Sequence, residues 1–104
     1  MTDLLRVTTT TPDLHSAKKL ARTLVSENLA GGAQIIGPVL SLSWNGEREE
    51  YQLVLSTTTA AYRALAAALT RHHPWQNPEI TVVALAGASE AYAQWLREAT
   101  GAED

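Results

Sequence analysis

The sequence predicts an α+β fold in which one antiparallel sheet carries its helices on one face. Short runs rich in β-branched residues alternate with segments whose apolar residues recur at helical spacing. Asn45-Gly46 stands between two strand-like runs and is a strong short signal for a hairpin. The resulting order, β-α-β-β-α-β-α, begins with six elements that match the split β-α-β, or ferredoxin-like, arrangement, with an additional C-terminal helix.

Composition sets the class of protein. The 104 residues fit a single domain spanning 1–104, with 101–104 as a frayed end, and 45% hydrophobic with 18% charged residues is typical of an ordered chain. No apolar run approaches the roughly 18 residues of a membrane span, and the N-terminus lacks a signal-peptide pattern. We therefore expect a cytoplasmic protein with no membrane partner.

Charge and cysteine usage narrow the chemistry. The net charge is −3 and the basic residues are scattered, so no nucleic-acid partner is expected. The chain has no cysteine, which excludes disulfides, thiolate zinc sites and a cysteine nucleophile.

The first strand is expected at residues 4–10, followed by a helix. Thr11 is the expected N-cap, and Pro12 suits the first helical position. Leu29-Ala30-Gly31-Gly32 is expected to end this helix, because paired glycines favour the left-handed turn. The expected buried face consists of Leu14, Ala17, Leu20, Ala21, Leu24 and Val25.

A long hairpin is expected from two strands at residues 33–44 and 47–57. A two-residue turn at Asn45-Gly46 would pair Trp44 with Glu47 and Leu40 with Tyr51. This register places the apolar residues of both strands on one face.

The second half should contain a helix, a strand and a last helix. Thr58 or Thr59 caps the first of these helices, which must end near His72 because Pro74 restricts the residue before it. A strand at 79–85 follows, and Gly87 and Ser89 open the last helix. The apolar stripes comprise Tyr62, Leu65, Ala66 and Leu69 in one helix, and Ala91, Tyr92, Trp95, Leu96 and Ala99 in the other.

His72 and His73 are the candidate metal ligands, because imidazole binds copper, zinc and nickel. Two ligands do not complete a site, and His15, Glu79 or a neighbouring subunit could add to them. The structural alternative is that a histidine at a helix C-terminus bonds the last carbonyls.

Other polar motifs have structural explanations as well. Pro74 and Pro78 are expected to fix the corner between helix and strand, and Glu79 to open the next strand. Trp75 could close a cleft, but it is expected to pack under the corner. The cluster of Glu47, Glu49 and Glu50 beside Arg48 is expected to be a solvated edge rather than a hard-cation site. The threonines at 8–11 suit capping better than phosphate binding.

Signatures of an enzyme are missing from the sequence. There is no glycine-flanked nucleophilic serine, no HExxH, and no paired acid and base at helical spacing. We therefore expect a binding or assembly protein rather than an enzyme.

Several motifs in order resemble the CutA family, named for divalent-cation tolerance. Residues 73–79, His-Pro-Trp-Gln-Asn-Pro-Glu, match its most specific element. The others are Thr11-Pro12-Asp13, Leu29-Ala30, Trp44-Asn45-Gly46, Thr57-Thr58 and the pair Tyr92 and Trp95. Gly32, Leu42 and Ser56 depart from the family pattern, where cysteine, tyrosine and lysine are frequent, and the hairpin is shorter.

The resemblance implies a ferredoxin-like subunit in a tight homotrimer with strand edges paired between subunits. It also implies a role in tolerance of divalent metals, copper above all, with weak copper(II) or other divalent-metal binding and no required cofactor. Trp44, Pro74, Trp75, Pro78, Glu79, Tyr92 and Trp95 are the expected interface or structural residues.

Physical reasoning also favours association. A small sheet with a long hairpin leaves edges that need covering, and three tryptophans are a large apolar load for one small core. The alternative places the tryptophans in the monomer's own core. A second functional hypothesis, by analogy of fold, is a trimeric small-molecule sensor resembling nitrogen-regulatory proteins, with its ligand between subunits near Arg71, His73 and Trp75.

Overall fold

The computed structural model describes residues 3–101 and contains the predicted elements in the predicted order. The expected frayed end lies outside the described residues, apart from Gly101, which forms a turn. The elements are β1 (Leu4–Thr11), α1 (Leu14–Ser26), β2 (Gly32–Ser43), β3 (Gly46–Thr58), α2 (Thr59–His72), β4 (Ile80–Ala84) and α3 (Glu90–Ala99).

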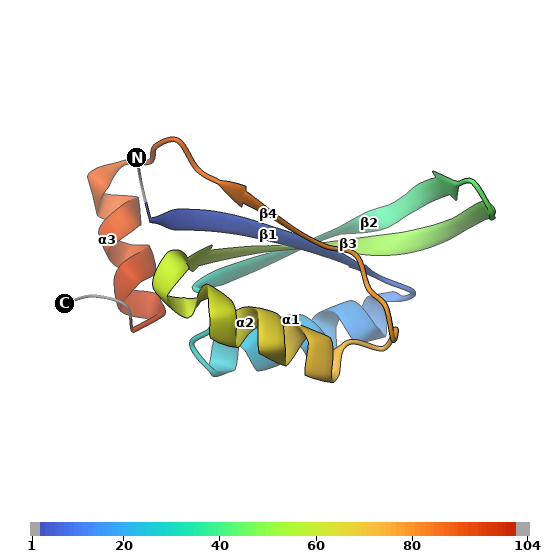
Figure 1. The fold of residues 1–104 in the computed structure, drawn as a ribbon, viewed down its shortest axis with the longest axis horizontal. Coiled ribbons are helices and arrows are strands. Elements are labelled where there is room, and N and C mark those ends of the chain that lie inside the picture. Colours follow the sequence, from blue (N-terminus) through green and yellow to red (C-terminus); the bar gives the residue numbers. More distant parts are fainter. Residues whose placement is uncertain (1–2, 102–104) are drawn as a thin grey trace.

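The four strands form one sheet in the order β2-β3-β1-β4, and all neighbours are antiparallel. Helices α1 and α2 lie side by side on one face of this sheet (Figure 1). This is the predicted ferredoxin-like arrangement. None of the helices within residues 3–101 has the length and apolar character needed to cross a membrane.

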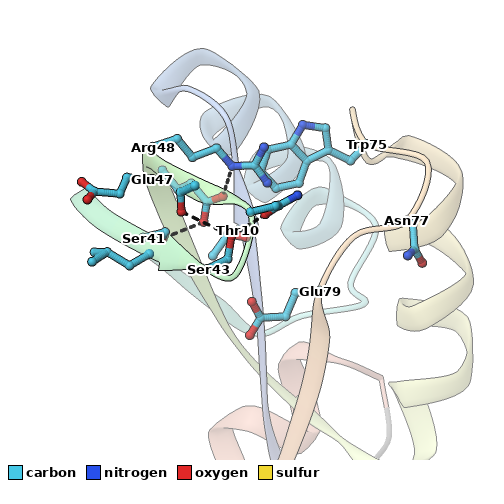
Figure 2. Close-up of a pocket in the computed structure, with 12 residues that line it drawn as sticks. Thr10, Ser41, Ser43, Glu47, Arg48, Trp75, Asn77 and Glu79 are labelled. Atoms are coloured by element: carbon cyan, nitrogen blue, oxygen red, sulfur yellow. Dashed lines mark hydrogen bonds and ion pairs between the residues drawn. The ribbon is translucent and has the colours of Figure 1, made fainter.

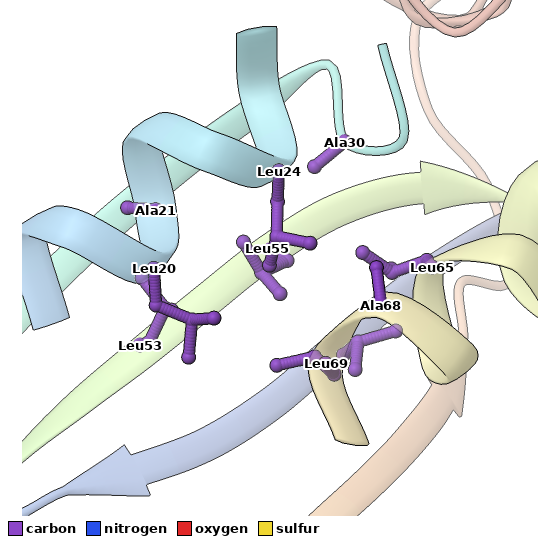
Figure 3. Close-up of a cluster of buried hydrophobic side chains, with 10 residues drawn as sticks. Leu20, Ala21, Leu24, Ala30, Leu53, Leu55, Leu65, Ala68 and Leu69 are labelled. Carbon is purple, nitrogen blue, oxygen red and sulfur yellow. The ribbon is translucent and has the colours of Figure 1, made fainter. Parts of the chain in front are cut away.

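Leucines dominate the core between the sheet and the two helices (Figure 3). Its largest members are Leu20, Leu24, Leu53, Leu55, Leu65 and Leu69, all almost fully buried. Their burial supplies most of the apolar driving force, at about 25 cal/mol for each Å² removed from water.

The predicted helix faces need correction at their margins. Leu14 and Val25 are 39% and 38% exposed, because they lie in the terminal turns of α1 and outside the core stripe. In α2 the small residues Ala61 and Ala68 are buried, whereas Tyr62 and Ala66 are only partly covered. Alanines let α2 approach the sheet closely, which leaves the larger tyrosine at the rim.

Helix α3 lies across one end of the sheet, beside the start of α2 (Figure 1). Its Ala93 and Leu96 bury Leu4 of β1, and Arg97 donates to the Asp3 carboxylate through three bonds, the shortest of 2.8 Å from Nη2 to Oδ1. The predicted apolar stripe of α3 was wrong at Tyr92 and Trp95, which are 39% and 48% exposed in the single chain.

Two of the three N-caps predicted from the sequence are confirmed. Thr58 caps α2 by accepting a bond from the Ala61 N–H, and Ser89 caps α3 in the same way. The predicted Thr11 cap was wrong. Asp13 accepts the bond from the Ser16 N–H at 2.8 Å, and Thr11 instead donates its hydroxyl to the Asp13 carbonyl.

The predicted hairpin register is displaced by two residues. Leu42 pairs with Glu47 and Leu40 with Glu49, so the two-residue turn is Trp44-Asn45. The Ser43 hydroxyl closes this turn on the Asn45 side chain, and Gly46 takes a φ of +137° directly after it. Beyond Val39 a shift of two keeps the side chains on their predicted faces, so the apolar pattern alone does not detect it. Before the irregularity at Ile36 the shift is three, because Ile36 pairs with Gln52, and the β2 side chains there lie on the face opposite to the predicted one.

The hairpin projects as an arm beyond the helices (Figure 1). An irregularity between Ile36 and Val39 bends β2, and Gly37 there has a φ of +155°. Leu40 and Leu42 are 62% and 67% exposed, and Trp44 at the tip is 96% exposed. The tryptophan at the tip therefore lies outside the core of the single chain.

Candidate functional site

The most specific sequence motif forms a corner between α2 and β4. His73 leaves helical dihedrals, with φ −65° and ψ 140°, while its N–H still bonds the Leu69 carbonyl at 2.9 Å. Pro74 enforces this exit, because the residue before a proline avoids the helical region. The chain then passes over the end of the sheet through residues 74–79 to reach β4.

His73 is buried against the end of β1. Its Nδ1 accepts the Trp75 N–H at 3.0 Å, so the ring proton lies on Nε2. Nε2 donates to the Thr10 carbonyl at 2.9 Å, with the Thr9 hydroxyl 3.1 Å away. Burial lowers the pKa of His73 below its ordinary value. Both ring nitrogens are therefore used within the protein, and a metal ion at His73 would have to displace one of these bonds.

His72 has a different environment, although it is the adjacent residue. It is exposed in the last turn of α2 and lines an open hollow of about 290 Å³ together with His15 of α1. The structure thus separates the two histidines that the sequence presents as a pair.

A larger, polar pocket of about 510 Å³ lies between the hairpin arm and the corner (Figure 2). Glu50 of β3 forms its buried base, with only 6% of the residue exposed. The Ser41 hydroxyl donates to Glu50 Oε1 at 2.8 Å, and Arg48 Nε donates to Oε2 at 2.7 Å.

Electrostatic effects on Glu50 oppose one another. Burial raises the pKa of its carboxyl, but the bonds from Arg48, Ser41 and Thr10 and the charge of Arg48 together lower it by more, so the net pKa is below the ordinary value. The carboxylate is consequently held in its ionised form at neutral pH.

Arg48 and Trp75 close one side of this pocket. The guanidinium carbon lies 4.5 Å from the centroid of the Trp75 ring, a cation–π contact, and the Trp75 ring lies 5.7 Å from the His73 ring. Figure 2 shows Arg48 and Trp75 in contact above the pocket, with Glu79 on the side of the corner. The pocket could hold a polar molecule between arginine, indole and carboxylate groups.

The remaining candidate residues are distributed unevenly around this pocket. Glu79 and Asn77 line it, whereas Trp44, Tyr92 and Trp95 do not. Tyr92 and Trp95 stack on one another on α3, with ring centroids 5.8 Å apart. Among residues 3–101, no three histidine or acidic side chains come together in a group that could hold a metal ion.

Glu50 is the residue that sequence reasoning missed. The acidic cluster was expected to be a solvated edge, and that expectation was wrong for Glu50, although Glu47 and Glu49 are exposed. Residues two apart in a strand lie on the same face, so the sequence could have predicted an ion pair between Arg48 and Glu50. Nothing in the local sequence indicated that the partners Ser41 and Thr10 would bury it.

Comparisons with known proteins agree on one family. The family described as "CutA1 divalent ion tolerance protein" matches residues 5–99. The divalent-cation tolerance protein CutA of Escherichia coli K12 is 37% identical over 91 residues, which cover 84% of this chain and 81% of that protein.

Solved structures give the same result. CutA1 of Thermus thermophilus has a TM-score of 0.88 at 34% identity, covering 94% of this chain and 99% of that one. CutA of Synechococcus elongatus has a TM-score of 0.90 at 32% identity, covering 96% and 92%. By its fold, its motifs and these relatives, the chain belongs to the CutA1 family of divalent ion tolerance proteins.

Proposed function

We propose that this chain is a divalent-cation tolerance protein that acts in copper homeostasis as a homotrimer of one-domain subunits. The observation that carries the proposal is the family match over residues 5–99, together with a relative of that name at 37% identity. No cofactor is required for this role, and the protein binds or buffers metal rather than catalysing a reaction.

Self-association is supported by the apolar surface of the single chain. Leu40, Leu42 and Trp44 on the hairpin arm are all more than 60% exposed, and Ile36 and Val83 on the sheet are 46% and 58% exposed. Apolar side chains gathered on a projecting arm mark a surface that associates. The edge strand β2 adds unpaired backbone groups to the same region.

Metal binding is proposed to be weak and to use nitrogen ligands, which suit copper(II). Of the two candidates His72 and His73, the exposed His72 is the more accessible, since His73 is bonded through both nitrogens. The alternative role as a small-molecule sensor has no support from the relatives described above, which are all named for cation tolerance.

The protein is proposed to act in the cytoplasm. The CutA protein from Archaeoglobus fulgidus, at 20% identity, is described as periplasmic, so fractionation of cells by compartment is the appropriate check.

Growth in copper tests the proposed function. A host strain that lacks its own CutA gene should grow more poorly in elevated copper(II) than the parent strain, and expression of this chain should restore growth. Sodium chloride at matched ionic strength serves as the control. Equal growth with and without the chain over the whole copper range would refute a role in copper tolerance.

A further inference from the structure

The hollow beside His72 is lined by two imidazoles from distant parts of the sequence. Its lining includes His15, Lys19 and Thr23 of α1 and His72 and Pro74 at the end of α2. Both histidines are exposed to solvent.

The topology explains why these residues meet. Helix α1 begins just after β1 ends at Thr11, and α2 begins at the opposite end of the sheet, where Thr58 pairs with Leu4. The two helices therefore run antiparallel, and the last turn of α2 lies beside the first turn of α1. His15 is in that first turn and His72 in that last turn.

The end of α2 also assigns different roles to the adjacent histidines. Successive side chains of a helix point about 100° apart. His73 points to the Thr10 carbonyl at the end of β1, so His72 points toward α1 and solvent. The imidazole that accompanies His72 is consequently that of His15.

We propose that His15 and His72 form a two-imidazole site for copper(II), with water completing the coordination. Imidazole nitrogen is a preferred ligand of this ion, and the C-terminal end of α2 favours a cation. This inference rests on the metal-handling part of the proposed function and specifies the ligands. With two protein ligands, the site binds copper(II) weakly and reversibly.

Lys19 provides a distinctive test of the site. Its ammonium group lines the same hollow and opposes the approach of a cation. Replacing Lys19 with glutamine keeps a long polar side chain and removes the charge. Copper(II) binding by Lys19→Gln should be several-fold tighter than binding by the unmodified chain.

The direct experiment is a calorimetric copper(II) titration of the untagged chain at neutral pH, combined with electron paramagnetic resonance. We expect one copper(II) per chain with two nitrogen ligands, and an affinity at least tenfold lower in His15→Ala and in His72→Ala. The double variant retains His73, the third histidine of the chain, and reports any binding there. Circular dichroism and sedimentation confirm that each variant keeps its fold and mass.

The outcomes separate this site from the proposed function. Unchanged binding in His15→Ala, or full binding in the double variant, would overturn the two-imidazole site. If the unmodified chain binds no copper(II) but restores growth in copper, the site is refuted while the tolerance function stands. If the site binds as expected but growth is not restored, the function fails while the site stands.

Discussion

The two adjacent histidines show how strongly the role of one residue depends on its distant partners. His73 has ring bonds to Thr10 and to Trp75, and Thr10 is 63 positions away in the sequence. His72 faces solvent beside His15. The His-His doublet and the helix end at Pro74 could be predicted from the sequence. The partners of each ring could not, because they depend on the packing of α2 against β1.

Replacing His73 should destabilise the protein. His73→Ala leaves the Thr10 carbonyl and the Trp75 N–H without their partner, so the free energy of unfolding should fall by about 2 kcal/mol at pH 7. Urea unfolding, followed by circular dichroism at one fixed protein concentration, measures this difference.

The pH dependence of stability checks the same residue. Burial lowers the pKa of His73 below 6.5, so the unfolded chain binds the proton more readily. The contribution of His73 is therefore present above pH 6.5 and is lost as the pH falls below it. When the pH falls from 7 to 5, the free energy of unfolding should decrease less for His73→Ala than for the unmodified chain. Equal decreases would contradict a buried His73 with a lowered pKa.

Glu50 should contribute through its ionised form. Its pKa is below the ordinary 4.5, because the bonds from Arg48, Ser41 and Thr10 and the charge of Arg48 together outweigh the effect of burial. The stabilisation is present above pH 4.5 and is lost as the pH falls through the lowered pKa. At pH 7 the free energy of unfolding of Glu50→Gln should be about 1–2 kcal/mol lower than that of the unmodified chain. This difference should narrow toward pH 3.

The matched control for Glu50 is Glu49→Gln, which changes the exposed neighbour on the opposite face of β3. Chemical denaturation at pH 7 and pH 3 measures both variants. A loss of the same size in Glu49→Gln would show that net charge, rather than the buried carboxylate, causes the effect.

At the scale of elements, local chemistry decides where helices begin. Thr58 is fully buried and accepts the Ala61 N–H, whereas Thr59 is exposed in the first turn of α2. Thr58→Ala should therefore lower the free energy of unfolding by about 1 kcal/mol, and Thr59→Ala should have little effect. Thermal or urea unfolding distinguishes the two, and the reverse order would assign the cap to Thr59.

The hairpin shows where sequence patterns fail to specify an element. Alternation predicted the correct faces in the outer half of the hairpin, beyond Val39, but the turn was placed at Asn45-Gly46 instead of Trp44-Asn45. The Ser43 side chain and the left-handed φ of Gly46 fix the actual turn. The irregularity between Ile36 and Val39 also changes the register, and no spacing rule locates it from one sequence.

At the scale of the whole molecule, apolar surface is the main unexplained feature of the single chain. Helix and strand signals and the family motifs predicted the fold well, because each element has its own boundary residues. The same signals predicted most of the buried leucines, among them Leu20, Leu24 and Leu65, but they left open whether the tryptophans lie in the core of the single chain. Trp44 and Trp95 remain 96% and 48% exposed because the core is filled by leucine and alanine.

A charge on the hairpin arm should disrupt the proposed trimer without unfolding the subunit. Leu42 is 67% exposed in the single chain, so Leu42→Glu should keep the fold of the subunit and its circular dichroism spectrum. If the trimer buries the arm, the same substitution should lower the mass of the species measured by sedimentation. Arg63→Glu on the exposed side of α2 is the control and should keep the mass of the unmodified chain. Retention of the full mass by Leu42→Glu would remove the arm from the interface.

The most direct measurement is the sedimentation-velocity mass of the unmodified chain at micromolar concentration. A homotrimer built on the exposed hairpin arm predicts one species with three times the 11.2 kDa of a single chain. The species should persist on tenfold dilution. A single species of 11.2 kDa would contradict the trimer and would leave Leu40, Leu42 and Trp44 without a partner from another copy of the chain.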